Sequence, residues 1–352
     1  MTTPLTYIHS GSFSGSATSL RRALAARLPV QAWDLLAYAR QPALLGARLR
    51  ATAEARRAGR GVPFTKTRAW SEAVQRTLER EALGRPAGPI LFVQTLPAFV
   101  LNGSTRYAIY TDRVALEGAA SPTPFRSRYS RPWLEREAAF LRGAHRIYLM
   151  GPSTADVLVR EYGVPAARIE VVGAGPNMEL GPPGDSTACR RLLFAGIEWE
   201  RKGGPDLVAA FAEVRREHPE LELIVVGGDR RGPLPPGVRS VGRVPHAGMD
   251  ALYSTVDAFV LPSHHDAVPI VLIEALSKGL PCIGTTAGNQ QWLIDGGGMI
   301  VEPGQVEALA EALRALIRDY PTYRRRAQER GRQVRETFRW DRVAERILDG
   351  LD

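Results

Sequence analysis

Short apolar runs alternate with helical stretches along the whole chain of 352 residues. Parallel strands need crossover connections long enough to hold a helix, so this alternation is typical of parallel sheets covered by helices. The sequence therefore predicts an α/β fold. Six strands are expected in each half: residues 5–9, 30–35, 90–95, 107–111, 147–150 and 169–172, then 191–197, 221–227, 238–241, 258–262, 281–285 and 299–301.

A cluster of glycine and proline separates these two sets of strands. It covers residues 173–177 and 180–185, and such clusters are typical of linkers. With roughly 150 residues per domain as a guide, we expect two domains, at residues 1–178 and 185–334. Residues 332–351 predict one amphipathic helix, which can pack on either domain. If it packs on the first domain, residues 335–352 would complete that domain.

Basic residues are concentrated in the first half of the chain. Residues 1–180 hold 24 Lys and Arg against 13 Asp and Glu, a balance of +11, whereas residues 181–352 hold 22 against 24, a balance of −2. Eleven of the basic residues lie in the segment 40–85, among apolar positions. Two interpretations stay open: an insert that lies on an anionic membrane surface, or ordinary helices with a solvated basic face.

The sequence favours a cytoplasmic protein. No run approaches the roughly 20 apolar residues that span a bilayer, and the first residues lack the basic and apolar regions of a signal peptide. Two cysteines are too few for a zinc cluster or a disulfide framework. A peripheral position at the inner membrane face is the alternative that the basic first half allows.

The first informative motif is LLFAGIEWERKGG at residues 192–204, where a strand runs into a charged loop. Ligands of open α/β sheets bind outside the carboxyl ends of strands, so Arg201 and Lys202 are placed to meet phosphate oxygens. Gly203 and Gly204 permit close approach of the backbone. The alternative is a solvated loop that precedes a helix.

The second motif, at residues 258–281, has the pattern strand, loop, helix, strand. Asp266 falls in the loop, and Glu274 falls about two turns into a helix that begins near Pro269, so both acids can face one ligand. The N-terminus of that helix suits a phosphate or a sugar hydroxyl. Because Glu274 lies among apolar residues, its carboxylate needs a partner, and a ribose diol is a good candidate.

In this order, these motifs resemble those of the retaining glycosyltransferases of the GT4 family. That family has the GT-B fold, in which two Rossmann-like parallel-sheet domains face each other across a cleft. The resemblance spans nearly the whole chain and is strongest over residues 191–307, where LELIVVGG (221–228), VGRVPH (241–246), LPS (261–263) and AGN (287–289) follow one another. It implies transfer of a sugar from a UDP- or GDP-linked donor to an acceptor hydroxyl, with retention, in polysaccharide or glycolipid biosynthesis.

The resemblance also implies roles for residues of the second domain. In that family the acid pair consists of two Glu residues separated by seven others. This chain has Asp266 and Glu274 at that spacing, so the first side chain is one methylene shorter. Asp266 would contact the donor sugar and Glu274 the ribose, while Arg201 and Lys202 would neutralise the leaving diphosphate. The rest of the expected nucleotide site consists of Arg243, Val244, Val268, Pro269 and Ile270.

Two further site residues are expected in the first, acceptor-binding domain. The strand at residues 5–9 and the following SGSFSGS resemble the family's first strand and glycine loop, with Gly15 near the donor phosphates. The alternative is a turn before a helix capped by Ser14 or Ser16. Asp112 ends a strand where related enzymes carry a polar residue, commonly His, and would bond an acceptor or donor hydroxyl; an ordinary turn residue is the alternative.

No Asp-x-Asp and no zinc-ligand spacing occur, so we expect metal-independent catalysis and no cofactor beyond the nucleotide-sugar substrate. A carbohydrate or lipid-linked acceptor is the expected partner. Two other functions stay open: a sugar-nucleotide epimerase of the same fold, and a non-enzymatic binder of nucleic acid or an anionic surface. The lack of a helix-turn-helix or an aromatic RNA-binding strand speaks against nucleic acid.

Overall fold

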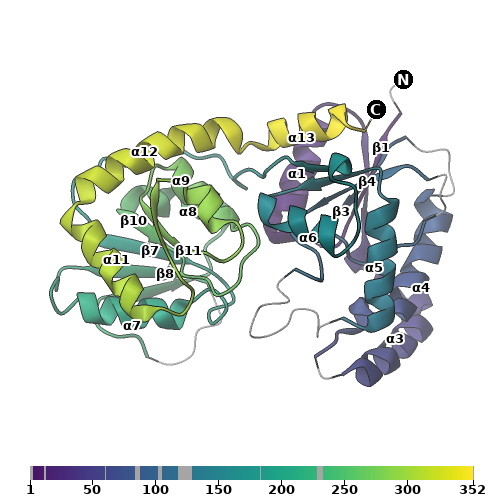
Figure 1. Cartoon of the computed structure of the whole chain (residues 1–352), viewed down its shortest axis with the longest axis horizontal. Coiled ribbons are helices and arrows are strands. Elements are labelled where there is room, and N and C mark those ends of the chain that lie inside the picture. The colour runs from purple at the N-terminus through teal and green to yellow at the C-terminus, as the bar shows by residue number, and fades with distance from the viewer. Residues whose placement is uncertain are drawn as a thin grey trace. The chain divides into compact units, whose positions relative to one another are not determined.

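A computed structural model describes residues 3–11, 13–59, 61–83, 88–101, 105–117, 129–182, 184–227 and 233–351. Ser12 and Gly228, which belong to two of the sequence motifs, lie outside these residues. The chain divides into two compact units (Figure 1). The first comprises Met1–Ala174 and Trp340–Asp352, and the second comprises Gly175–Arg339.

The first unit is built on a six-stranded sheet in the order β2-β1-β3-β4-β5-β6, with every neighbouring pair parallel. Tyr7 in β1, next to the edge strand, pairs with Ala32 of β2 on one side and with Leu91 of β3 on the other. The strands are β1 (Leu5–His9), β2 (Val30–Asp34), β3 (Ile90–Val93), β4 (Tyr107–Thr111), β5 (Arg146–Leu149) and β6 (Ile169–Val171).

The second unit has its own six-stranded parallel sheet, in the order β12-β11-β10-β7-β8-β9. Each of the twelve strands overlaps a run predicted from the sequence. The interior strands are short and almost continuously apolar, as buried parallel strands are, whereas the edge strands β2 and β9 are partly exposed. The strands are β7 (Arg191–Ala195), β8 (Glu222–Val226), β9 (Val238–Gly242), β10 (Ala258–Val260), β11 (Cys282–Thr285) and β12 (Gly298–Val301).

Helices cover the faces of both sheets (Figure 1). In the first unit, Thr67 and Ser130 cap two helices by accepting hydrogen bonds from the backbone N–H groups of Trp70 and Trp133. The helices of this unit are α1 (Ser16–Ala25), α2 (Leu35–Tyr38), α3 (Leu45–Ala58), α4 (Arg68–Leu78), α5 (Arg131–Gly143), α6 (Ala155–Arg160) and α13 (Trp340–Asp349). Those of the second are α7 (Gly204–Val214), α8 (His246–Thr255), α9 (Ile270–Ser277), α10 (Gln290–Ile294), α11 (Val306–Arg318) and α12 (Tyr320–Thr337).

The prediction of one amphipathic helix over residues 332–351 is wrong. Helix α12 ends at Thr337 and α13 begins at Trp340. The apolar residues on either side of the break have different partners: Phe338 packs on Trp292 of the second unit, with ring centroids 5.1 Å apart, whereas Ile347 lies buried in the first, where its carbonyl accepts from Tyr148. The helix is interrupted at Phe338, whose φ of −92° and ψ of 81° lie outside the helical region.

Glu137 of α5 is fully buried in the first unit. Its carboxylate accepts hydrogen bonds from the hydroxyls of Thr95 (2.8 Å) and Tyr162 and from the backbone N–H of Ala115 (3.2 Å). These contacts hold the segments that follow β3 and β4 against the helix. Burial raises the pKa of Glu137 to about 7, because the hydrogen bonds offset only part of the desolvation.

Replacing Glu137 with glutamine should change how stability depends on pH. The pKa of Glu137 is about 7 in the folded state and 4.5 in the unfolded state, so the folded state binds the proton more tightly. Its contribution to the free energy of unfolding is therefore complete below pH 4.5 and is lost as the pH rises through 7. The shift corresponds to about 3 kcal/mol. In urea unfolding, the free energy of E137Q relative to wild type should rise by about that amount between pH 4.5 and 7.5.

Glu135, on the same helix but exposed, provides the matched control. The difference between E135Q and wild type should stay constant over the same pH range, to within about 0.5 kcal/mol. An equally flat E137Q difference would mean that the folded state does not hold a proton on Glu137.

Candidate functional site

The strand order of the second unit defines where a ligand can bind. From β7 the chain proceeds outward through β8 to β9, and then returns to the opposite side of β7 to form β10. This reversal between β7 and β10 is the topological switch point, where crevices open beyond the carboxyl ends of parallel strands. Arg201 and Lys202 follow β7, and Asp266 follows β10, so all three lie in the loops of this position.

Asp266 brings the two predicted cations together. Its carboxylate is almost buried; one oxygen pairs with the Lys202 ammonium, and the other lies 3.7 Å from the Arg201 guanidinium. Arg201 also donates to the carbonyl of His265 (2.6 Å) and to the Glu198 carboxylate (3.0 Å). The result is a partly buried cluster in which cations from one loop are positioned by an anion from the other.

Two glycines allow these loops to lie so close. Gly203, with φ +73°, caps the start of α7, and a Cβ there would stand 2.0 Å from the carbonyl oxygen of Pro262. Gly288 has φ +60°, and a Cβ there would stand 1.8 Å from the carbonyl oxygen of Asp266. Both conformation and space therefore require glycine at these positions.

Glu274 is nearly fully buried in α9, yet it already has protein partners. Its carboxylate accepts from the Tyr253 hydroxyl (3.0 Å) and from the backbone N–H of Asn177 (3.2 Å). The protein itself therefore supplies the partners that burial of this carboxylate requires, and the contact with a ribose stays a prediction. Burial raises the pKa of Glu274 to about 7, and the two donors only partly counter this.

The segment between the two acids is also buried. Val268, Pro269 and Ile270 run into the start of α9, and Pro269 is its N-cap without a side-chain hydrogen bond. Asn289 fixes this segment from the neighbouring loop, since both its backbone N–H and its side-chain amide donate to the carbonyl of Ala267 (3.0 and 2.9 Å). Asn289 therefore fixes the start of this segment at Ala267.

Arg243 and Val244 lie further along the same edge of the sheet. They follow β9, two strands from β7, and the Arg243 side chain is exposed while Val244 is half-buried. The carbonyl of Gly242 accepts from the N–H of Gly227, which joins the ends of β8 and β9. These residues are at the carboxyl edge but are separated by β8 from the cationic cluster.

In the first unit, Gly15 follows β1 at that sheet's own switch point, between β1 and β3. Gly15 is the N-cap of α1, with φ +89°, in place of the serine cap weighed as the alternative. The hydroxyl of Ser16 is buried with no hydrogen-bond partner among the described residues. Asp34, which sequence reasoning missed, fixes this loop by accepting from the N–H of Gly11 (3.0 Å).

Asp112 follows β4 and is half-buried, one strand away from that switch point. Its backbone carbonyl accepts from the hydroxyl of Thr154 (3.0 Å). The strand that borders the switch point, β3, is followed instead by Gln94, which has φ +72°, a value uncommon outside glycine. Sequence patterns gave no indication of this residue, because strain depends on the backbone around it.

A third missed feature is the pair of His264 and Asp206. The imidazole Nε2 of His264 lies 2.8 Å from a carboxylate oxygen of Asp206. The backbone N–H of His264 donates to the carbonyl of Arg201 (2.9 Å). The sequence placed His264 near the site but could not link it to Asp206, 58 positions earlier in the chain.

Among the described residues, no group of three or more His, Cys, Asp and Glu side chains is arranged to hold a metal ion. In the same part of the chain, no helix combines the length and apolar character needed to cross a bilayer.

Residues 189–319 match the family model described as Glycosyl transferases group 1. The matched segment contains the cationic cluster and Glu274. It is 31% identical over 209 residues to the glycogen synthase of Mycobacterium tuberculosis, an alignment that covers 56% of this chain and 48% of that protein. The chain spans about half the length of the curated relatives it matches.

Solved structures extend the likeness over both units. Sucrose-phosphate synthase from Thermosynechococcus elongatus has a TM-score of 0.72 at 19% identity, covering 99% of this chain and 98% of its own. Anabaena Alr3699/HepE, solved in complex with UDP, has a TM-score of 0.69 at 14% identity and covers 99% of both chains. At these identities the likeness concerns the fold, and the predicted GT-B class is confirmed.

Replacing Gly203 with alanine should destabilise the second unit more than the same change at Gly296. Both glycines have positive φ, so both variants bear the left-handed strain of roughly 1–2 kcal/mol. Only Gly203 also faces a backbone carbonyl, whereas nothing lies within 4 Å of a Cβ at Gly296. Urea unfolding should show an additional loss of about 2 kcal/mol for G203A. Equal losses in the two variants would contradict the close packing of these loops.

Proposed function

We propose that this protein transfers a sugar from a nucleotide-diphosphate sugar to an acceptor hydroxyl, with retention at the anomeric carbon. The observation that carries the proposal is the meeting of Arg201 and Lys202 on Asp266 at the switch point of the second sheet. Two cations held in a partly buried position suit a diphosphate, and the family-matched domain contains them.

Arg201 and Lys202 would act mainly in the transition state. As the bond between the anomeric carbon and the diphosphate breaks, negative charge grows on the leaving phosphate. Cations already placed in the site, with Arg201 held by the carbonyl of His265 and Lys202 beside Asp266, stabilise that charge with little reorganisation. The chain's contribution is therefore positioning and charge stabilisation.

Asp266 has a second proposed role. It neutralises Lys202, and a diphosphate in the site would compete for that ammonium. The carboxylate would then be available to accept a hydrogen bond from a hydroxyl of the donor sugar. Its short side chain fits this double role, because the carboxylate stays close to the loop that carries Lys202.

Glu274 would hold the ribose of the nucleotide. A carboxylate has about four acceptor positions, and Tyr253 and Asn177 occupy two, which leaves capacity for ribose hydroxyls. Arg243 and Val244 would lie near the base, and Val268, Pro269 and Ile270 would provide backbone groups along the phosphates. In the first unit, Gly15 and Asp112 remain proposed contacts for the donor phosphates and the acceptor.

The remaining parts of the proposal rest on resemblance and composition. UDP is one expected nucleotide, because a protein of the same fold was solved with it. Catalysis would need no metal, with the two cations serving the diphosphate. A carbohydrate or lipid-linked acceptor, in polysaccharide or glycolipid biosynthesis, would suit a cytoplasmic enzyme whose basic first half meets the inner membrane face.

Thermal unfolding with UDP, GDP, ADP, TDP and CDP, each with and without EDTA, tests this proposal. A ligand at about 100 times its dissociation constant stabilises the folded state by roughly 2.7 kcal/mol, which corresponds to several degrees in Tm. We expect one nucleotide to give that shift with and without EDTA. A shift that disappears with EDTA would overturn metal independence, and no shift with any nucleotide would overturn the site.

The pH dependence of nucleotide binding tests Glu274 separately. Because ribose hydroxyls would donate to the ionised carboxylate, and its pKa is about 7, affinity should fall as the pH decreases from 8 to 6. The expected loss is up to about tenfold. E274Q should bind more weakly at pH 8 and lose this dependence. A variant with wild-type affinity and an unchanged pH profile would remove Glu274 from the site.

Replacing Arg201 or Lys202 with glutamine should lower kcat for turnover of the selected nucleotide sugar by about 10²–10³-fold. The KM for the donor should change much less, because the cations act on charge that develops as the bond breaks. The exposed Arg325 of α12 gives a matched control, and R325Q should keep wild-type kinetics. A higher KM with unchanged kcat would mean that the cations bind the donor equally well in the ground state and in the transition state. An isomerised sugar nucleotide as product would indicate an epimerase.

A further inference from the structure

Helix α3 of the first unit buries small residues and exposes large ones. Ala47, Ala51 and Ala55 are buried along one side, whereas Leu45 and Leu49 are 58% and 65% exposed. A surface helix normally buries its large apolar residues, so this arrangement is reversed. The two leucines lie one turn apart on the same face, and they form an apolar ridge toward solvent.

Four arginines surround this ridge. Arg48 and Arg50 lie on either side of Leu49, and Arg56 is two turns further along nearly the same face, with Arg57 beside it. All four are exposed, and within the described ranges no carboxylate lies at ion-pair distance from any of them. The face is therefore both apolar and strongly positive.

The acid of this helix, Glu54, has hydrogen-bond partners outside the helix. Glu54 accepts hydrogen bonds from the backbone N–H groups of Arg68 and Ala69 at the start of α4 (2.9 Å each). It also accepts from the hydroxyl of Ser130 (2.9 Å). The negative charge that could neutralise the helix is used to fix α3 against its neighbours.

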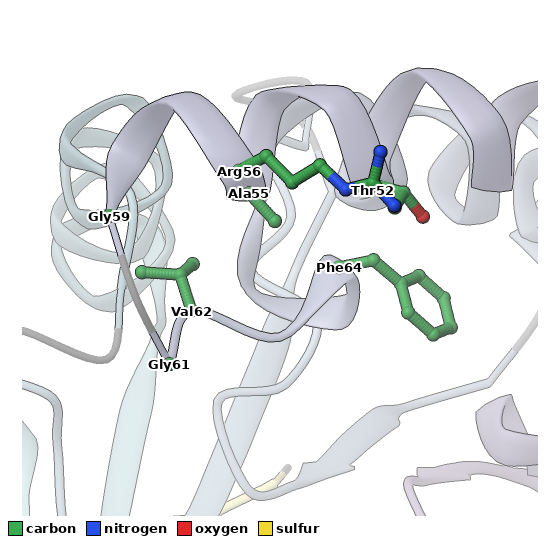
Figure 2. Close-up of a pocket in the computed structure, with 7 residues that line it drawn as sticks. All are labelled: Thr52, Ala55, Arg56, Gly59, Gly61, Val62 and Phe64. Carbon is green, nitrogen blue, oxygen red and sulfur yellow. The ribbon is translucent and has the colours of Figure 1, made fainter.

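A pocket of about 310 Å³ opens at the C-terminal end of the same helix. Figure 2 shows Arg56 extended along the helix toward Thr52, with Val62 and Phe64 on the opposite side. None of the residues assigned to the nucleotide site lines this pocket. Its apolar lining next to a cation suits a lipid better than a nucleic acid backbone, which needs no apolar contact.

We propose that this face, the α3 surface (Leu45, Arg48, Leu49, Arg50, Arg56 and Arg57), docks on a membrane that contains anionic lipids. The helix would lie in the plane of the interface, with the leucines among the acyl chains and the arginines at the phosphates. The proposal deepens the peripheral membrane position included in the proposed function. It does not depend on the transfer of a sugar.

Sedimentation of the full chain with lipid vesicles tests this proposal. At 0.1 M salt, the chain should bind vesicles of 30% phosphatidylglycerol in phosphatidylcholine and bind pure phosphatidylcholine at least tenfold more weakly. R48Q/R50Q should lower the partition coefficient by about 25-fold, or fivefold per arginine. L45S/L49S should lower it by about tenfold. Binding should also weaken as salt screens the arginines.

Two controls remove the same chemistry elsewhere on exposed surfaces. R325Q/R326Q in α12 deletes two exposed charges, and V159S in α6 deletes an apolar side chain that is 41% exposed. Both should bind as wild type does. If they weaken binding as much as the α3 variants, or if no variant weakens it, the α3 surface is not the docking site. Absence of binding to anionic vesicles would also overturn the proposal.

A duplex oligonucleotide separates the lipid from nucleic acid. Binding to DNA that R48Q/R50Q weakens and L45S/L49S leaves intact, together with loss of vesicle binding, would assign the arginines to nucleic acid. The nucleotide thermal shift of each α3 variant should equal that of wild type. Vesicle binding without any nucleotide shift would overturn the proposed function and leave the membrane contact standing.

Discussion

The parallel alignment of all strands within each sheet is the constraint on which the site depends. It places every carboxyl end of a sheet at one edge, so the loops after β7 and β10, separated by about 60 residues of chain, meet there. Gly203 and Gly288 then let the backbones approach within contact distance. Only at that separation can Asp266 hold Lys202 and Arg201 together.

Buried carboxyls illustrate how differently this fold uses one chemical group. Asp266 is paired with cations, whereas Glu137 and Glu274 are buried with neutral donors and have pKa values of about 7. Glu137 faces only protein groups and ties segments after β3 and β4 to α5. Glu274 accepts from two donors and Glu137 from three, and Glu274 is the acid for which we propose a ligand.

The strands and the order of the motifs could be predicted from sequence because buried parallel strands leave continuous apolar runs. The loops that carry Arg201, Lys202 and Asp266 followed from those strands. The partners of Glu274 could not be predicted, since Tyr253 and Asn177 lie 21 and 97 residues away and reach it only through tertiary packing. The break at Phe338 was missed because helical periodicity does not reveal which core each turn joins.

The helix α13 has a consequence for how the chain is connected. Because Trp340–Asp352 belongs with Met1–Ala174, the backbone passes between the units twice, after Ala174 and after Arg339. The second unit is therefore an insertion within the first. A single proteolytic cut at either crossing leaves the second unit covalently joined to one segment of the first unit, through the crossing that stays intact. Removing the C-terminal 13 residues would instead strip a helix from the first unit, where Tyr148 and Arg27 bond its backbone carbonyls.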